Sequence, residues 1–409
     1  MRVALSALAC ACVKIPDFQP RDGGGDTSDA MTDGGMQGPL VSVVPNGTNN
    51  MGALATAPGY EMVFADNGAH FPYQLNLLAN PKQLILGGSQ ECADEHGMGI
   101  ALYPVTRING EPNVDYGTST LSIPLSGPYV GQVRLQWSVG YACPSSTSGA
   151  ISGHTTFSFF PDGRLTRFDV VNNSAARNAA DCTACGTTSS QFYVTSYNTL
   201  IVDGNASLSD GTQAGLASYG AEVAPLGSAC IRERGYSLAF SWVDTRTRMR
   251  VAAAGPPART IAFIKDMYNG ATLPVDGWFS TTQMGISTEA CGTLESRIAE
   301  FSADDHQLRI NSNPLGAALE DGIYGGDPQT GGYPIDYPVT LEPAGALPRI
   351  PAGFAVWLHS TPTPNPLRVT HSAGHTGNWY YEQHPDANSV VFWFNVPLEQ
   401  GETITINES

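Results

Sequence analysis

The chain of 409 residues is 42% hydrophobic and only 14% charged, with 45 Gly and 29 Pro. Long helices need more Ala, Leu, Glu and Lys than such a composition supplies, so a mainly helical protein is excluded and short strands joined by many turns are favoured. The formal net charge of −17 argues against nucleic acid as a partner, because a polyanion is bound by a concentrated basic face.

Residues 1–12 are typical of an export signal. Met1 and Arg2 precede a short apolar run that leads through small residues to Cys10 and Cys12. This order resembles the signal of bacterial surface lipoproteins, although the Leu expected three residues before the lipidated cysteine stands two or four residues before these two. The resemblance implies a lipid on Cys10 or Cys12 and a place in the cell envelope, at the outer membrane or cell surface. The alternative is a plain secretory signal and a secreted or periplasmic protein.

Residues 13–39 are rich in Asp and Gly and contain almost nothing to bury, which predicts a disordered acidic tether. Such tethers behind a lipidated cysteine are similar to those of bacterial surface lipoproteins. No later stretch approaches the roughly 18 apolar residues of a membrane-spanning helix, so we expect the lipid to be the only contact with the membrane.

The main β domain is predicted to cover residues 40–321. Its clearest feature is a hairpin formed by strands at 154–160 and 164–171 around Pro161-Asp162-Gly163, because Gly can take the left-handed conformation that such a loop needs. Apolar residues that alternate with polar ones, or short runs between turns, predict further strands at 132–141, 192–202, 236–243, 246–253 and 259–264. A helix is predicted at 294–301, with Thr293 as its N-cap.

Residues 322–351 are rich in Gly, Pro and Tyr and lack periodicity, which predicts a surface loop or a linker. Residues 352–409 are predicted to form a β-meander packed on the main domain. Its strands are expected at 354–359, 367–371, 379–384, 389–396 and 403–406. The whole pattern predicts an all-β fold, a β-sandwich or stacked-sheet supersandwich of many short antiparallel strands with at most one or two short helices.

The hairpin sequence Phe159-Phe160-Pro161-Asp162-Gly163-Arg164 resembles that of the galactose-mutarotase-like supersandwich domains of carbohydrate-active enzymes. The match covers this one hairpin. It implies a supersandwich fold and a carbohydrate ligand.

Six cysteines follow the signal region: Cys92, Cys143, Cys182, Cys185, Cys230 and Cys291. An even number in an exported chain predicts up to three disulfides, whose pairing the sequence leaves open. Cys182 and Cys185 have the spacing of a redox motif, but a reactive thiolate is stabilised by a following helix, whereas here a strand follows. We therefore expect structural disulfides.

Four of the eight histidines lie close together in the C-terminal region, and imidazoles are good ligands for Zn²⁺ or Cu²⁺. In a meander His371 and His375 would border one loop, while His359 and His384 would lie at the opposite end. Because the four residues would form two separate pairs, we expect neither a metal site nor another cofactor. His371 and His375 are the candidate ligands if a metal is bound.

Two strand faces could bind a ligand. Arg246, Arg248 and Arg250 alternate along one strand, where their guanidinium groups could hold an anionic polysaccharide or a lipid headgroup. Trp379 and Tyr381 share a face of another strand and could stack on sugar rings. The alternatives are a solvated basic face and a buried aromatic one.

No motif identifies a reaction, so whether the protein is an enzyme stays open. A polysaccharide lyase would need a His or Tyr base beside a cation, for which His154, Tyr141 and Arg164 are candidates, and a hydrolase would need two carboxylates about 5–10 Å apart. The leading hypothesis is an exported envelope protein that binds or processes carbohydrate, with a glycan or anionic polysaccharide as its partner. The alternatives are a polysaccharide lyase or glycoside hydrolase, and a non-catalytic structural or adhesive surface lipoprotein.

Overall fold

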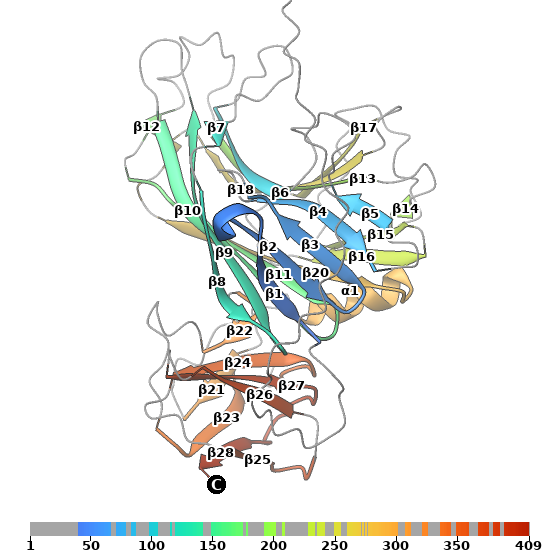
Figure 1. Cartoon of the computed structure of the whole chain (residues 1–409), viewed down its shortest axis with the longest axis vertical. Helices are drawn as coiled ribbons and strands as arrows, with labels where there is room; N and C mark the ends of the chain where they lie inside the picture. Colours follow the sequence, from blue (N-terminus) through green and yellow to red (C-terminus); the bar gives the residue numbers. More distant parts are fainter. Residues whose placement is uncertain are drawn as a thin grey trace, which may run out of the picture.

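The computed structural model describes residues 40–66, 71–78, 83–86, 98–104, 115–116, 119–141, 149–174, 177–178, 192–201, 207–208, 228–233, 235–241, 249–254, 260–270, 272–273, 275, 277–301, 307–311, 321–325, 336–344, 349–359, 367–375, 379–384 and 388–408. These residues form stacked β-sheets with one α-helix, which confirms the predicted all-β class (Figure 1). The predicted signal, the tether, Cys10 and Cys12 lie outside them. In this described part, no helix is long and apolar enough to span a membrane.

Two sheets form the main sandwich. The first has the order β1 (Ser42–Asn46), β2 (Gly52–Ala57), β3 (Tyr60–Phe64), β4 (Pro72–Leu77) and β5 (Gln83–Leu86), with a 3-10 turn η1 (Thr48–Asn50) between β1 and β2. The second has the order β14 (Ser207–Leu208), β15 (Ser228–Glu233), β16 (Tyr236–Ser241), β20 (Trp278–Ser287), β11 (Arg164–Asn172), β10 (Gly149–Phe159), β9 (Gly131–Tyr141) and β7 (Asp115–Tyr116), and β8 (Thr120–Ser126) also pairs with β9. Phe64 of the first sheet packs edge-on against Phe157 and Phe159 of the second, with ring centroids 5.3 and 6.3 Å apart.

Two smaller sheets complete this part of the chain. One has the order β17 (Met249–Ala254), β18 (Thr260–Gly270), β13 (Phe192–Ile201) and β6 (Met98–Pro104), and the other pairs β12 (Arg177–Asn178) with β19 (Thr272–Leu273). Strands were therefore predicted correctly in β9, β10, β11, β13, β16, β17 and β18, although β10 begins five residues earlier and β18 ends six residues later than predicted. The other strands of these four sheets were not predicted.

The predicted hairpin joins β10 to β11. Gly163 has a positive φ of 78°, and its N–H donates to the carbonyl of Phe160, while the Phe160 N–H donates to Arg164 O. Gly163 thus supplies the left-handed residue that the three-residue loop requires, as the sequence predicted.

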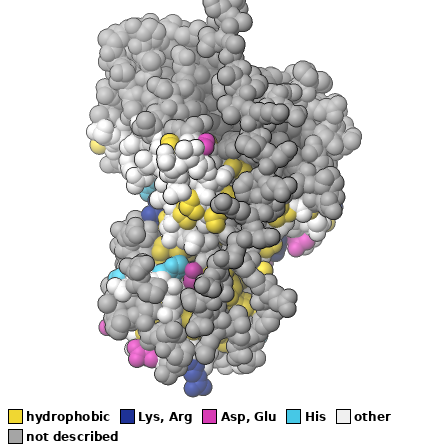
Figure 2. All heavy atoms as spheres, in the orientation of Figure 1, with side chains coloured by type: hydrophobic (Ala, Val, Ile, Leu, Met, Phe, Trp, Pro, Cys, Tyr) yellow, Lys and Arg dark blue, Asp and Glu magenta, His cyan; other side chains and the backbone are white. Residues whose placement is uncertain are grey.

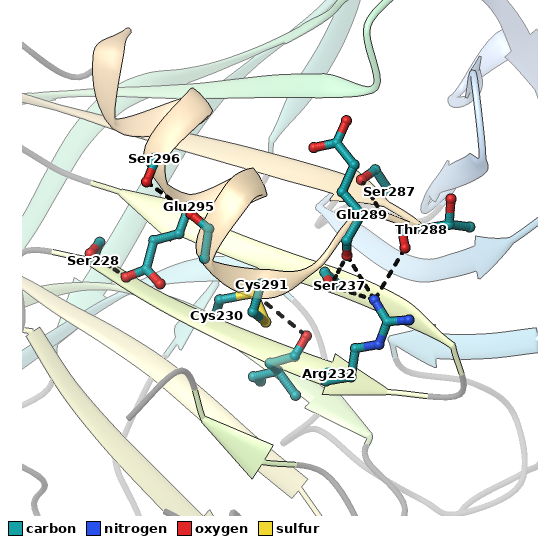
Figure 3. The surroundings of a disulfide bond; sticks show 12 residues. Ser228, Cys230, Arg232, Ser237, Ser287, Thr288, Glu289, Cys291, Glu295 and Ser296 are labelled. Carbon is teal, nitrogen blue, oxygen red and sulfur yellow. Dashed lines mark hydrogen bonds between the residues drawn. A yellow bond between two sulfur atoms is a disulfide. The ribbon is translucent and has the colours of Figure 1, made fainter. Parts of the chain in front are cut away.

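Helix α1 (Cys291–Glu300) covers one end of the nine-stranded sheet and is tied to it covalently (Figure 3). Leu294 and Ile298 pack over Gly285, where an added Cβ would lie only 2.8 Å from Ile298. A disulfide joins Cys230 of β15 to Cys291 at the start of the helix, which confirms these two cysteines as structural. Cys92, Cys143, Cys182 and Cys185 lie outside the described residues.

The predicted cap of this helix is wrong. The N-cap is Ala290, which makes no side-chain cap hydrogen bond, and Thr293 lies inside the first turn. The disulfide explains why the helix can begin without a polar cap, because it fixes the first residue to the sheet.

The C-terminal part is a second sandwich at one end of the first (Figure 1). One sheet has the order β21 (Gln307–Ile310), β23 (Val339–Ala344), β28 (Ile404–Glu408) and β25 (Leu367–His371). The other has the order β22 (Ile323–Tyr324), β24 (Phe354–His359), β27 (Ser389–Phe394) and β26 (Trp379–His384), with β22 parallel to β24. Apolar side chains of both sheets form the core between them.

This arrangement corrects two expectations. The last strands do not form a meander, because β25 and β26, which follow each other in the chain, belong to different sheets. The segment 322–351 is not simply a loop, since it contributes β22 and β23, and the C-terminal sheets already begin with β21. The two-sheet arrangement suits β27, every residue of which is buried. A strand that is apolar on both faces needs a packed layer on each side.

The second layer over β27 is the main sandwich itself. Trp393 of β27 stacks on Phe160 of the hairpin with ring centroids 5.7 Å apart, and Tyr380 of β26 stacks on Tyr129 at 5.0 Å. We call this apolar contact between the two sandwiches the junction. It comprises Leu125, Tyr129, Val130, Phe160, Ile323, Ala355, Trp357, Tyr380, Val391 and Trp393.

Arg164 lies at the edge of the junction and is completely buried. Its guanidinium carbon is 4.4 Å from the ring centroid of Phe160 and 3.4 Å from that of Phe301, the residue that follows α1. One Nη donates to the carbonyl of Gly353, and Nε is 3.5 Å from the carboxylate of Asp162. Arg164 therefore joins the main sheet, the end of α1 and the C-terminal sandwich.

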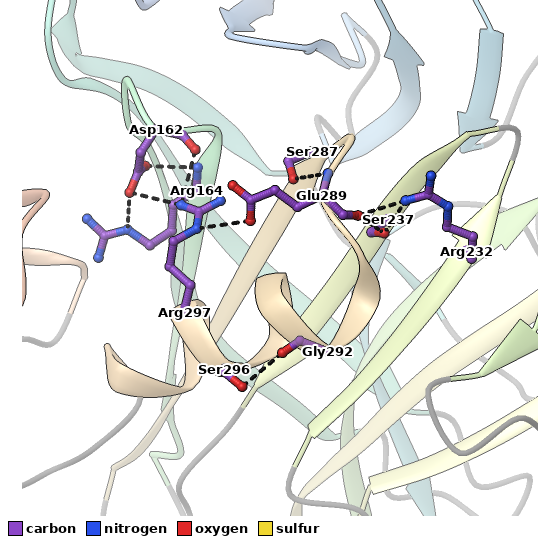
Figure 4. A network of polar contacts seen from close by, with 9 residues as sticks. All are labelled: Asp162, Arg164, Arg232, Ser237, Ser287, Glu289, Gly292, Ser296 and Arg297. Atoms are coloured by element: carbon purple, nitrogen blue, oxygen red, sulfur yellow. Dashed lines mark hydrogen bonds and ion pairs between the residues drawn. The ribbon is translucent and has the colours of Figure 1, made fainter.

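Burial disfavours the charged form of Arg164. Burial lowers its pKa to about 10, an effect that the nearby Asp162 carboxylate opposes. Arg297 of α1 approaches the same carboxylate at 3.5 Å (Figure 4). The Asp162 carboxylate thus forms ion pairs with two arginines, one buried and one partly exposed.

We predict that Arg164→Ala lowers the free energy of unfolding by about 3–5 kcal/mol, because it leaves a cavity beside the rings of Phe160 and Phe301 and an unpaired Gly353 carbonyl. Arg164→Met fills the space and should cost only about 1–2 kcal/mol. Urea unfolding measures both. Arg309→Met, which breaks an exposed pair with Glu342, is the control and should change stability by less than about 1 kcal/mol. Equal effects of the Arg164 and Arg309 substitutions would contradict this role.

Candidate functional site

The nine-stranded sheet has one face that is not covered by the first sheet, and the central strands place polar side chains on it. Three rows of residues lie in register across β9, β10, β11 and β20. They are Gln136, His154, Val170 and Phe279; Arg134, Thr156, Phe168 and Thr281; and Gln132, Ser158, Thr166 and Gln283. We call these rows the polar face. Because side chains alternate along a strand, the intervening residues point into the sandwich core.

The row nearest the C-terminal sandwich is closed. Gln132 donates to Ser158 at 3.1 Å and to Asp321 at 2.9 Å, and Thr166 donates to Gln283 at 2.7 Å. All four side chains of this row are buried. Its hydrogen bonds are therefore structural.

The two outer rows are more open. Arg134 and His154 are half-buried, and Arg134 Nε donates to the hydroxyl of Thr156 at 3.3 Å. Figure 2 shows histidine and basic side chains at the surface just above the waist between the two sandwiches. Arg134 and His154 thus give the polar face a cation and a hydrogen-bonding ring.

Aromatic rings adjoin these polar groups. Phe168 lies edge-on to His154 with ring centroids 6.2 Å apart, and it also contacts Phe279 at 5.9 Å. Phe279 is 58% exposed, more than any other large apolar side chain among the described residues. An exposed ring supported from behind by a second ring provides a flat apolar platform.

The His154 imidazole is held in its neutral form. Burial, and secondarily the Arg134 cation, lower its pKa, and the Asp169 carboxylate on the other side of the sheet only partly opposes this. A neutral imidazole has one donor and one acceptor nitrogen, so it can bind a hydroxyl in either sense. With Arg134 and Phe279, it provides contacts for both the hydroxyls and the apolar face of a sugar.

Carboxylates are not found among the residues of the three rows as described. The paired acids that a glycoside hydrolase would need are therefore not found on this part of the face. Among all described residues, no group of three metal-ligating side chains is suitably placed for a metal ion.

The structure does not bring the three proposed catalytic residues together. Tyr141 pairs with Gly149, which is five residues from His154, or about 17 Å along the strand. Arg164 lies six residues from Val170, the partner of His154 on β11, or roughly 20 Å away. Because Arg164 is also fully buried against protein groups, it is not available to a substrate.

The proposed ligand-binding residues lie elsewhere. Trp379 and Tyr381 pack against the core of the C-terminal sandwich, and the Tyr381 hydroxyl accepts a hydrogen bond from the Leu367 N–H. Tyr380 faces the opposite way, into the junction, so the strand is covered on both faces. Arg250 lies in β17 by its backbone, and Arg246 and Arg248 are outside the described residues.

His371 and His375 form one close pair, with ring centroids 4.7 Å apart. Ala373 N–H donates to Nδ1 of His371, so Nε2 carries the proton and donates to the carbonyl of Pro397 at 3.3 Å. Both nitrogens of His371 are therefore engaged with the backbone. The second pair, His359 and His384, lies apart from the first, on the other sheet.

Sequence reasoning missed Arg134 and Phe279 as partners of His154. The strand of Arg134 was predicted from the sequence, but β20, which carries Phe279, was not. It is also far from β9 in the chain, and only sheet order makes the two residues neighbours. The one local signal is Phe279 itself, which alternates with buried Ser280 in a strand.

The chain matches no protein-family profile and no curated protein. Among solved structures it is similar to a putative aldose 1-epimerase from Klebsiella pneumoniae (8% identity, 63% of this chain and 86% of that one, TM-score 0.41). It is also similar to a heparan sulfate lyase from Pedobacter heparinus (10%, 71% and 38%, 0.36) and to a TPR-domain protein from Parabacteroides distasonis (10%, 58% and 47%, 0.37). The chain thus spans less than half of the last two. Likenesses this distant assign no function.

The lowered pKa of His154 predicts a loss of stability in acid. In the unfolded chain His154 takes up a proton near pH 6.5, whereas the folded site resists protonation, so stability falls as the pH drops below that value. Urea unfolding at pH 7.5 and 5.5 should show a smaller acid loss for His154→Gln than for the parent. An unchanged acid loss would show that His154 is not held neutral.

Proposed function

We propose that the protein binds carbohydrate through the outer rows of the polar face. The observation that carries this proposal is the exposed Phe279 ring beside the half-buried His154 and Arg134. A sugar ring has an apolar C–H face and a rim of hydroxyls, and it matches an aromatic platform edged by hydrogen-bonding groups. A polar strand face alone would not need an exposed phenyl ring.

A neutral glycan fits this face better than a polyanion. Arg134 is the one cation of the outer rows as described, and the whole chain has a formal net charge of −17, which repels a polyanion at long range. The proposal is one of binding. Catalysis as a polysaccharide lyase would require a base and a cation at one point of the bound sugar, and the three residues proposed for this do not meet.

Phe279→Ala is predicted to weaken glycan binding about tenfold, since one stacked aromatic ring contributes on the order of 1–1.5 kcal/mol. Because the ring is exposed, the unfolding midpoint should stay nearly the same. Screening on an array of neutral and sulfated glycans, followed by calorimetric titration with the best neutral oligosaccharide, measures the change.

Val44→Ala is the matched control, because Val44 is 44% exposed on β1, away from the polar face. It should leave binding unaltered. Binding of no glycan by the parent protein would refute the proposed function, and preference for a sulfated polysaccharide would refute its neutral ligand.

We also infer that the protein is exported and carries a lipid on Cys10 or Cys12. The Cys230–Cys291 disulfide supports export, because disulfides persist in oxidising compartments. Expression of the full chain in a bacterial host with labelled palmitate should give a labelled, membrane-associated protein. Label should be lost in the Cys10→Ala/Cys12→Ala double variant, while a labelled double variant or an unlabelled parent would contradict the anchor.

A further inference from the structure

A second group of polar side chains lies on the C-terminal sheet, on the face that turns toward the main sandwich. His359 of β24 and His384 of β26 are both paired in register with Ser389 of β27. We call these three residues the histidine row. One row closer to the junction, Trp357 and Glu382 flank Val391 on the same face.

Four buried atoms of this group have no hydrogen-bond partner. They are Trp357 Nε1, His359 Nδ1, His384 Nε2 and Ser389 Oγ. Trp357 and Ser389 are only 3% and 0% exposed, so their polar atoms have lost their hydrogen bonds to water without gaining a protein partner. Leaving such a group unpaired costs about 1–3 kcal/mol, so four on one face of one sheet point to a ligand that supplies the missing polar partners.

Burial disfavours the charged forms of Glu382 and His384. The Glu382 carboxylate is 3.7 Å from His384 Nε2, which is too long for a hydrogen bond. Burial raises the pKa of Glu382 to about 8 and lowers that of His384, so the pair rests as carboxylic acid and neutral imidazole rather than as an ion pair. The Glu382–His384 pair therefore offers no charge to an anion, and among the described residues no three ligands are placed for a metal ion.

We propose that the histidine row, with Trp357 and Glu382, binds a neutral polyhydroxylated ligand, one sugar unit of a glycan that also contacts the polar face. The proposal rests on the proposed function and extends it to a second subsite. Neighbouring strands place the side chains of the row roughly 5 Å apart, the scale of one sugar ring. Hydroxyls, which both donate and accept, can satisfy an indole N–H, a serine and two imidazoles together.

Both groups adjoin the junction, because Glu382 acts on Tyr129 and the closed row of the polar face meets Asp321 just before β22. Figure 2 shows histidine side chains at the surface of both sandwiches. The Tyr129–Tyr380 and Phe160–Trp393 stacks fix the two sandwiches against each other between these groups. A chain of sugars, rather than a single one, could therefore bridge the waist. An extended peptide would instead pair with backbone groups at a sheet edge, and the histidine row lies on a sheet face.

The test compares Ser389→Ala with Ser280→Ala. Ser280 Oγ is also buried without a partner, but it points into the core of the main sandwich. Removal of either unpaired hydroxyl should leave the unfolding temperature equal or slightly higher. Calorimetric titration with the neutral oligosaccharide selected on the array should show about tenfold weaker binding for Ser389→Ala only.

Glu382→Gln gives an independent readout. The titratable groups around Glu382 are His359, His384, Tyr129 and Tyr380. Burial raises the pKa of the Tyr129 hydroxyl above its usual value. Above pH 8 the parent places a carboxylate on the face and should bind more weakly, whereas the Gln variant should bind equally at pH 7 and 9.

The outcomes separate the two proposals. Glycan binding that Phe279→Ala weakens but Ser389→Ala leaves unchanged would overturn the second subsite alone. Tighter binding of a short monosaccharide glycoside than of the oligosaccharide would overturn the bridge across the waist. Absence of all glycan binding by the parent would overturn the proposed function, and the subsite with it.

Discussion

Arg164 carries a full positive charge out of water, and the contacts that compensate for this come from three parts of the chain. Phe160 and Asp162 belong to its own hairpin, Phe301 follows α1, and Gly353 precedes β24 of the C-terminal sandwich. A buried guanidinium without these partners would be strongly unfavourable, so Arg164 couples the stability of the hairpin, the helix and the second sandwich. The remaining features of the molecule follow from that junction.

The junction determines which surfaces are covered. It closes the nearest row of the polar face, where Gln132 and Asp321 meet, and it leaves the rows of Arg134 and His154 partly open. On the other side it covers Trp393 and Tyr380 and leaves the histidine row at the far end of the same sheet. Partial burial lowers the pKa of His154 and His384 and raises that of Glu382, which favours their neutral forms. A surface of neutral donors and acceptors with an aromatic platform suits a sugar better than an ion.

Several expectations failed for one shared reason. Arg164 looked like a catalytic cation, and Trp379 and Tyr381 looked like a sugar platform, because their residue types suit those tasks. Burial decides otherwise: Arg164 is enclosed by aromatic rings, and Trp379 and Tyr381 pack on a core. The histidines were predicted correctly to form two pairs, yet from a meander that does not exist. Strand order, which sets those neighbours, depends on long-range pairing that leaves little trace in the local sequence.

The sequence by itself determined the all-β class, the positions of twelve of the 28 described strands, the Gly163 hairpin and the doubly buried strand β27, because these depend on local periodicity and turn chemistry. Only the tertiary structure decided that His154 lies beside Arg134 and Phe279, and that His359 and His384 flank Ser389. The physical reason is that a strand's own pattern says which face is apolar but not which strand lies next to it. A binding surface on a sheet is assembled from neighbours that can be more than a hundred residues apart in the chain, as β9 and β20 are.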